Sequence, residues 1–221
     1  MRATDRLDVV VNNAGRVLIA PVEETDDDEA RAVFDSNFFG TLNVTRSVVP
    51  IMRRQGGGTI VNVSSIGARV APCYYGIYAA TKRAMEALSE AVQLEVLDFG
   101  IRVVIIEPGN FHTNILHSAV IARRFGADSP YLDGLRQLQE EAKELYHTFE
   151  LEGTPGPEQV ATAIVAAVDD PDGPFTYAVG ADAEMFFDAL RDAPTDAIAM
   201  EAISQRLMGV SYIHRHDEDA H

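Results

Sequence analysis

Residues 7–15, Leu7-Asp8-Val9-Val10-Val11-Asn12-Asn13-Ala14-Gly15, decide the fold of this chain. The nearly continuous β-branched run within this stretch favours a strand of a parallel sheet that is covered on both faces. Similar runs lie at 59–63 and 101–106, and a shorter one lies at 176–179. The sequence therefore predicts four strands of a parallel sheet.

Helical patterns separate these strands. Apolar and small residues recur at helical spacing over two long stretches, 29–54 and 75–99. Further helices are predicted at 131–149, 157–168, 182–190 and 196–207. Strands that alternate with helices imply right-handed crossovers and a doubly wound, Rossmann-like α/β fold. We expect one domain over 1–210 and a disordered polar tail at 211–221.

Composition and charge exclude several classes of protein. The chain has 221 residues and a formal net charge of −16, so nucleic acid is not expected as a partner. We expect neither a signal peptide nor a membrane span, because the first residues are not apolar enough and no apolar stretch reaches the roughly 18 residues that a span needs. Cys73 is the only cysteine, which fits a reducing, cytoplasmic location, and we expect it to be a small buried filler.

One spacing points to proton transfer. Tyr78 and Lys82 are four residues apart in a predicted helix, so their side chains lie on one face. A tyrosine has an ordinary pKa of about 10, and an adjacent cation favours its ionised form. We therefore expect Lys82 to tune Tyr78 for acid–base chemistry. Ser65 follows the preceding strand and is expected to orient a substrate oxygen, because no histidine or acid is spaced to activate a serine as a nucleophile.

These residues are part of a longer ordered set. The set comprises Asn12-Asn13-Ala14-Gly15, Asn37, Ser65, Tyr78, Lys82, Pro108-Gly109 and Thr113. In order and spacing it resembles the short-chain dehydrogenase/reductase family, over residues 7 to about 183. The later segments, including 177–183, look most like the hydroxysteroid and retinol dehydrogenase subgroup. The resemblance implies an enzyme that transfers hydride between NAD or NADP and an apolar alcohol or ketone.

The resemblance also implies a role for each matching residue. Tyr78 corresponds to the catalytic acid/base, Ser65 to the substrate-orienting hydroxyl, and Lys82 to the residue that tunes Tyr78 and holds the nicotinamide ribose. Asn37 corresponds to the position where a helix irregularity anchors a water of the proton relay. The implied cofactor-binding residues are Asn12, Ala14, Gly15, Tyr78, Lys82, Pro108, Gly109, Phe111 and Thr113.

One feature of the family does not occur in this sequence. The chain contains no Gly-x-x-x-Gly-x-Gly turn, and eleven residues precede Asn12. By resemblance, the first three strands of the family's sheet and its pyrophosphate site are missing, whether by natural truncation or by a misplaced start. We therefore expect weak or absent binding of NAD(P), and an exposed edge strand at 7–11 that promotes association or poor solubility.

Several alternatives stay open at this stage. The apolar residues Ile115, Leu116, Val120, Ile121 and Phe125 either line a substrate pocket or belong to the core. A metal site is not expected, because the histidines of the tail are more simply explained by a solvated segment. The helices at 29–54 and 75–99 are expected to form a homo-oligomer by resemblance. The chain could instead be a non-catalytic interaction partner, or an epimerase or dehydratase that uses the same Tyr-Lys pair.

Overall fold

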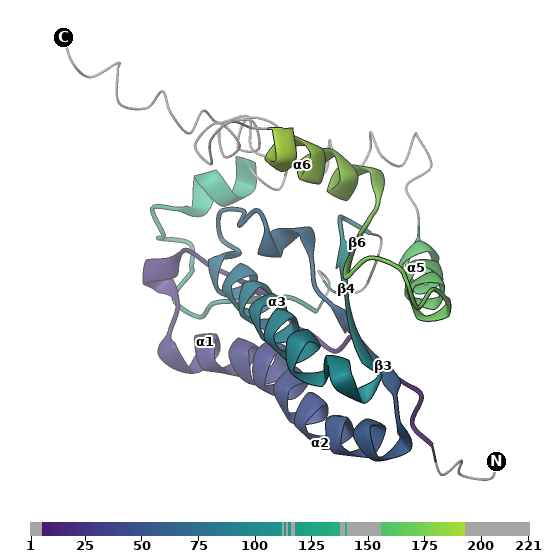
Figure 1. The fold of residues 1–221 in the computed structure, drawn as a ribbon. Helices are drawn as coiled ribbons and strands as arrows, with labels where there is room; N and C mark the ends of the chain where they lie inside the picture. The colour runs from purple at the N-terminus through teal and green to yellow at the C-terminus, as the bar shows by residue number, and fades with distance from the viewer. Residues whose placement is uncertain are drawn as a thin grey trace.

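The computed structural model describes residues 6–111, 113, 115, 118–137, 140 and 156–192. Its main sheet has four parallel strands in the order β1 (Val9–Asn12), β3 (Gly58–Val63), β4 (Ile101–Pro108) and β6 (Thr176–Val179). Each strand follows a helix or precedes one, and the chain advances across the sheet from β1 to β6 (Figure 1). The four predicted parallel strands are confirmed.

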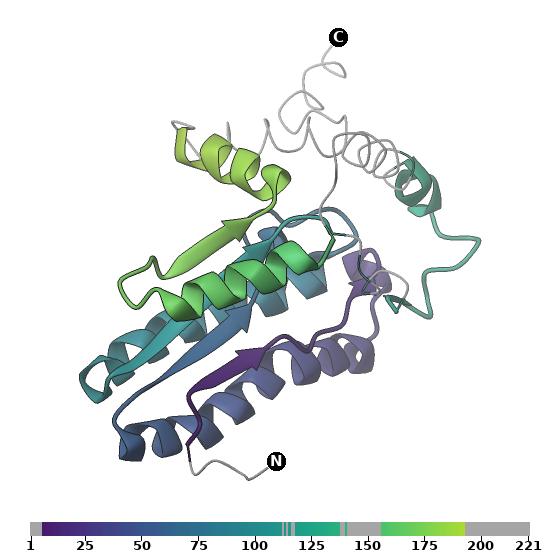
Figure 2. The same cartoon turned by 90° about the vertical axis from the view of Figure 1, so that its right-hand side faces the viewer.

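Helices cover both faces of this sheet. The helices α2 (Gly40–Gln55) and α3 (Gly76–Val96) lie side by side on one face, and α1 (Asp27–Phe34) precedes α2 (Figure 1). The helix α5 (Glu158–Asp169) packs against β4 and β6 on the other face, and α6 (Ala181–Asp192) follows β6 (Figure 2). The fold is therefore the doubly wound, Rossmann-like α/β architecture that the sequence predicts.

Successive side chains of β3 and β4 point to opposite faces of the sheet, so the core has a part on each face. Ile60 of β3 and Val103 of β4 face α2 and α3, where they pack with Met52. Their neighbours Val61 and Val104 face α5 on the opposite side. All five side chains are at most 1% exposed. This double burial explains why both strands are apolar almost without interruption.

The long helix predicted at 29–54 is divided in the structure. Asp26 and Glu29 form a capping box at the start of α1, and the chain then widens into a π-helix, η2 (Asp35–Phe39), before α2 begins. The α2 helix ends at Gly56, which has φ of +83° and therefore favours glycine. The helix predicted at 75–99 consists of α3 and a final 3₁₀ turn, η4 (Leu97–Phe99).

A second, two-stranded sheet lies beside the first and was not predicted. Its strands β2 (Leu18–Ile19) and β5 (Val120–Ile121) pair in parallel, and η1 (Val22–Glu24) and η3 (Ile66–Ala68) are short 3₁₀ turns. Phe125 is buried in a cluster with β2, and Ile115 and Val120 pack against that cluster. These residues therefore belong to the core, whereas Ile121 is 55% exposed. Leu116 lies outside the described residues.

Further expectations from the sequence concern the sheet edge, Cys73 and the later helices. β1 is the edge strand of the described sheet, and Val9 and Val11 are 36% and 41% exposed. Cys73 is exposed, so the expectation that it is a buried filler is wrong. No described helix combines the length and the apolar character that crossing a bilayer requires. The predicted helix at 131–149 is described over 132–137, and the helix at 196–207 and the tail at 211–221 lie outside the described residues.

Candidate active site

The candidate site is at the carboxyl edge of the main sheet. The strands β1, β3 and β4 are neighbours in one parallel sheet, so their carboxyl ends meet at the same edge. These ends carry Asn12 and the turn after it, Ser64-Ser65, and Pro108-Gly109. The predicted site residues of the three strands are thus brought to one edge.

Ser65 and Tyr78 come together at Gly67. Ser65 caps the 3₁₀ turn η3, and its hydroxyl oxygen accepts a 3.1 Å hydrogen bond from the Gly67 amide. A Cβ atom on Gly67 would lie 3.4 Å from Ser65 Oγ and 3.6 Å from Cε1 of Tyr78. The two side chains therefore share the space beside a glycine, with the Ser65 hydroxyl within hydrogen-bonding reach of the Tyr78 phenol.

Lys82 lies one helical turn after Tyr78 and is 4% exposed. Its ammonium group donates a 2.7 Å hydrogen bond to the carbonyl oxygen of Val63, and it lies 5.8 Å from the centre of the Tyr78 ring. Burial lowers the pKa of Lys82 to about 8, and the charge of Glu86 acts in the opposite direction. Lys82 is thus close to its titration point near neutral pH.

The pKa of Tyr78 moves in the opposite direction from the one we expected. Burial raises the pKa of the phenol, the hydrogen bond with Ser65 lowers it, and burial is the larger effect. Lys82 is bonded to the main chain of Val63 instead of to the phenol oxygen. Tyr78 is consequently a protonated phenol at neutral pH, which suits a proton donor.

Asn37 occupies the π-helical turn and is 1% exposed. Its amide group binds the main chain of Arg16 twice: its oxygen accepts from Arg16 N at 2.9 Å, and its nitrogen donates to Arg16 O at 3.0 Å. The same nitrogen donates to the Thr81 hydroxyl at 3.0 Å, and this hydroxyl donates to the Tyr78 carbonyl oxygen at 2.7 Å. Asn37 thus connects the turn after β1 with the helical turn that carries Tyr78.

The predicted residues after β1 divide into two groups. The Asn12 amide donates a 2.8 Å hydrogen bond to Asn62 on β3, and Asn62 donates a 2.8 Å bond to Ser89 on α3. Asn12 therefore stabilises the sheet. Ala14 and Gly15 are exposed, and a Cβ atom on Gly15 would lie 3.4 Å from Asn37 Oδ1 and 3.6 Å from Lys82 Nζ.

The turn after β4 is held by a residue that sequence reasoning did not single out. The Asp182 carboxylate, at the start of α6, accepts a 2.6 Å hydrogen bond from the Asn110 amide. It lies so close to Gly109 that a Cβ atom there would overlap it. Phe111 is 6% exposed and packs in the core beside Val179, whereas Thr113 is exposed. Pro108 and Gly109 therefore lie at the site, and Phe111 lies beneath it.

Sequence reasoning also missed a buried charged cluster behind the site. Glu86 is 2% exposed and Glu107 is fully buried, and Arg69 binds both of them. Two signals could have revealed it. Glu107 interrupts an otherwise apolar strand, and Glu86 follows Lys82 by one turn on the buried face of α3. A carboxylate at either position needs a buried partner.

The residues at this edge can hold and protonate a carbonyl oxygen. Ser65 and Tyr78 converge on one point, and Lys82 supplies a buried cation beside the exposed turn at Ala14 and Gly15. The same groups suit the ribose hydroxyls of a nicotinamide nucleotide, because an ammonium and a phenol offer donors at hydrogen-bonding range. Within the described residues, no three His, Cys, Asp or Glu side chains lie together as a metal site.

Comparisons with known proteins identify the family of this chain. Residues 1–123 match the family described as short chain dehydrogenase. The 3-ketodihydrosphingosine reductase of Bacteroides thetaiotaomicron is 36% identical over 82% of this chain, which spans 66% of that relative's length. Bovine retinol dehydrogenase 8 is 35% identical over 73% of this chain, which spans 52% of its length. An uncharacterised oxidoreductase of Schizosaccharomyces pombe is 33% identical over 93% of this chain and 83% of its own length.

Solved structures give the same result. A short-chain dehydrogenase from Streptomyces avermitilis superposes with a TM-score of 0.65 at 36% identity, over 84% of this chain and 67% of its own. A short chain dehydrogenase from Burkholderia cenocepacia, solved in complex with NADP, also has a TM-score of 0.65, at 25% identity over 92% of this chain and 70% of its own. The chain therefore belongs to the short-chain dehydrogenase family.

Proposed function

We propose that this chain is an NAD(P)-dependent oxidoreductase that reduces the carbonyl group of an apolar substrate. The observation that carries this proposal is the meeting of the Ser65 hydroxyl and the Tyr78 phenol at Gly67, one turn from the buried Lys82. A relative that is named as a reductase supports carbonyl reduction, in which the protonated Tyr78 phenol gives its proton to the substrate oxygen.

In this reaction Ser65 and Tyr78 bind the substrate oxygen from two sides and orient the carbonyl carbon. A bound NAD(P)H supplies the hydride. Tyr78 gives its proton to the oxygen as negative charge develops there, and Ser65 donates a second hydrogen bond to the same oxygen. The Lys82 ammonium then stabilises the phenolate that forms on Tyr78.

The cofactor is proposed to bind mainly through its nicotinamide end. The residues proposed to contact it are Ala14, Gly15, Tyr78, Lys82, Pro108, Gly109 and Thr113, whereas Asn12 and Phe111 support them from the sheet and from the core. No Gly-x-x-x-Gly-x-Gly sequence is present to supply a pyrophosphate site, so we expect binding that is weak. Fluorescence titration with NADH and NADPH tests this expectation, and a micromolar dissociation constant for either cofactor would contradict it.

The proposed substrate class is a long apolar ketone or aldehyde. The relatives that support it are named as a 3-ketodihydrosphingosine reductase and a retinol dehydrogenase. Within this chain, Tyr74, Tyr75 and Tyr78 pack against an apolar cluster that includes Phe125, next to the proposed site. The three tyrosine rings are only partly buried, and the part that stays outside the core suits an apolar chain better than a sugar or an anion.

The decisive experiment measures carbonyl-dependent oxidation of NADH or NADPH at millimolar cofactor, with a long-chain ketone and an aldehyde as substrates. Tyr78→Phe should reduce turnover by at least about 10²-fold, because it removes the proton donor and leaves the ring. Tyr177→Phe is the matched control, since that hydroxyl bonds Arg102 on the far part of the sheet. Equal turnover by Tyr78→Phe and the unmodified chain would refute the mechanism.

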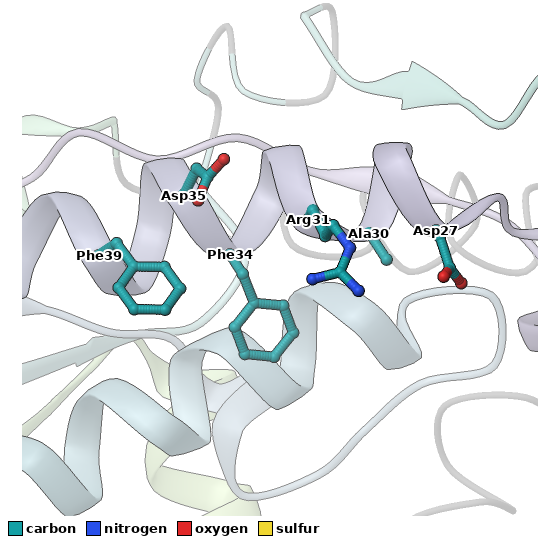
Figure 3. A pocket seen from close by; sticks show the side chains of 6 residues that line it. All are labelled: Asp27, Ala30, Arg31, Phe34, Asp35 and Phe39. Atoms are coloured by element: carbon teal, nitrogen blue, oxygen red, sulfur yellow. The ribbon is translucent and has the colours of Figure 1, made fainter.

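We further propose a homo-oligomer that forms through the outer faces of η2, α2 and α3. Apolar side chains are exposed there at Phe39, Val44, Ile51 and Leu94. A hollow of about 410 Å³ continues this surface along α1 and η2, where Phe34 and Phe39 point to the same side as Arg31 (Figure 3). Leu94→Asp should shift sedimentation toward the monomer. Val165→Asp, on exposed α5, should leave it unchanged.

A further inference from the structure

Two buried glutamates meet behind the candidate site. Glu86 comes from α3 and Glu107 from the end of β4, and they are 2% and 0% exposed. Both carboxyl groups lie against the same guanidinium group, that of Arg69. Arg69 Nε lies 2.8 Å from Glu107 Oε1 and 3.5 Å from Glu86 Oε2, so a single cation serves both groups.

The hydrogen bonds of this pair leave two oxygens without donors. Glu86 Oε1 accepts a 2.5 Å hydrogen bond from the Ser64 hydroxyl, and Glu107 Oε1 accepts the one from Arg69. Glu107 Oε2 and Glu86 Oε2 are buried and accept no hydrogen bond within the described part of the chain, and Glu86 Oε2 has only its longer ion pair with Arg69. One proton placed between the two carboxyl groups supplies the missing donor and removes the repulsion of two adjacent negative charges.

The pair adjoins the ends of β3 and β4 and the part of α3 that carries Lys82. Glu86 binds Ser64, the neighbour of Ser65, and its charge acts on Lys82 one turn earlier. Glu107 directly precedes Pro108 and Gly109. The charged groups around the pair are Arg69 from the loop before α3, Lys82 and Glu90 from α3, and Asp182 from α6, which lies against Gly109.

We propose that Glu86 and Glu107 share one proton at neutral pH and act as a positioning pair. The pair fixes Ser64 and the Lys82 ammonium. It thereby holds Ser65 and Tyr78 in their positions relative to each other. The shared proton does not depend on the proposed function, whereas the positioning role rests on it. The pair carries one negative charge beside two cations, Arg69 and Lys82. Loss of the proton places a second buried charge at the junction of β3, β4 and α3 and loosens it.

The first experiment observes the proton without cofactor or substrate. The infrared spectrum of the chain at pH 7 should contain the C=O stretch of a protonated carboxylic acid. This band should be lost in Glu107→Gln and in Glu86→Gln, and kept in Glu95→Gln, which changes an exposed residue of α3. Absence of the band from the unmodified chain would overturn the proposal, even if a variant fails to fold.

Stability gives a second readout of the same proton. Burial and Glu86 raise the pKa of Glu107 in the folded chain. As pH rises from the ordinary glutamate range to that raised value, the unfolded chain has released the proton and the folded chain retains it. The unfolding equilibrium constant should therefore rise by about tenfold per pH unit relative to Glu107→Gln. Parallel curves for the two proteins would contradict proton sharing.

The positioning role is tested through Lys82. With the lysine side chains labelled for NMR, the titration midpoint of Lys82 should move to lower pH in Glu86→Gln, because the negative charge of the pair then resides on Glu107 and no longer on Glu86, whose charge raises the Lys82 pKa. Glu95→Gln should leave the midpoint unchanged. An unchanged midpoint in Glu86→Gln would reject the positioning role. Since none of these readouts needs turnover, an inactive chain would count against the proposed function alone.

Discussion

The side chain of Asn37 binds both the amide and the carbonyl group of Arg16, so one π-helical residue fixes the turn that follows β1. This contact spans 21 residues of sequence and places Gly15 against Lys82. The edge of the sheet and the helix of the Tyr-Lys pair are thereby held at a set distance. The site depends on these hydrogen bonds of Asn37 as much as on the residues that would touch a substrate.

Replacement of Asn37 tests how much these hydrogen bonds contribute to stability. Asn37→Ala removes three hydrogen bonds from a buried position and should lower the free energy of unfolding by about 2–3 kcal/mol. Denaturant titration measures the change. Asn43→Ala, at an exposed position of the adjoining helix, should alter stability by no more than about 0.5 kcal/mol. Similar effects of the two substitutions would show that the hydrogen bonds of Asn37 add little to stability.

The lowered pKa of Lys82 predicts a pH dependence of stability. Its pKa is about 8 in the folded chain, whereas an unfolded lysine titrates near 10.4. Between these two pH values the unfolded chain binds more protons than the folded chain. The free energy of unfolding should therefore rise with pH, by up to about 1.4 kcal/mol per pH unit. Lys82→Met should lack this rise. Unfolding curves at closely spaced pH values measure it, and the same slope in both proteins would place the lysine pKa at its ordinary value.

Ser65 is predicted to act on the proton of Tyr78. The hydrogen bond with Ser65 lowers the phenol pKa, so Ser65→Ala should move the phenolate absorbance midpoint to higher pH. Carbonyl reduction should fall by roughly 10²-fold, because the substrate oxygen loses one of the two groups that orient it. Tyr78→Phe assigns the absorbance change, and Ser47→Ala is an exposed control. An unchanged absorbance midpoint in Ser65→Ala would show that Ser65 does not affect the pKa of the Tyr78 phenol.

The close approach of Gly109 and Asp182 predicts a coupled pair of substitutions. Gly109→Ala should cost about 1–3 kcal/mol, because the new methyl group overlaps the Asp182 carboxylate. Asp182→Ser shortens that side chain and keeps an acceptor for Asn110. The double variant should therefore be less destabilised than the sum of the single ones. Additive effects in thermal unfolding would show that the two residues do not compete for space.

Much of the fold follows from local sequence. The strands β3 and β4 are buried on both faces, so their apolar runs are unbroken and easily identified. β2 and β5 were missed because each has two residues, and their pairing depends on chain segments about 100 positions apart. The local sequence does not locate the π-helix, because its residues continue a helical pattern. Only the family resemblance implied an irregularity at Asn37, and the side chain of this residue is held by Arg16 and Thr81, which are distant in sequence.

The candidate site divides in the same way. The spacing of Tyr78 and Lys82 fixes their common face, so sequence alone brings them together. The direction of the Tyr78 pKa shift does not follow from spacing, because it depends on how deeply the ring is buried. The pairing of Glu86 with Glu107 depends on the packing of α3 against β4.

The π-helical turn at Asp35–Phe39 also constrains how this chain can change in length. A π-helical turn holds one residue more than the α-helical turn that it replaces. At about 100° per residue, positions seven apart in an α-helix face the same side, and the wider turn lets Val33 and Thr41, which are eight apart, both face the interior. Deletion of one residue in this turn would therefore keep the buried faces of α1 and α2 aligned, whereas insertion of one residue into either regular helix would turn a buried face toward solvent.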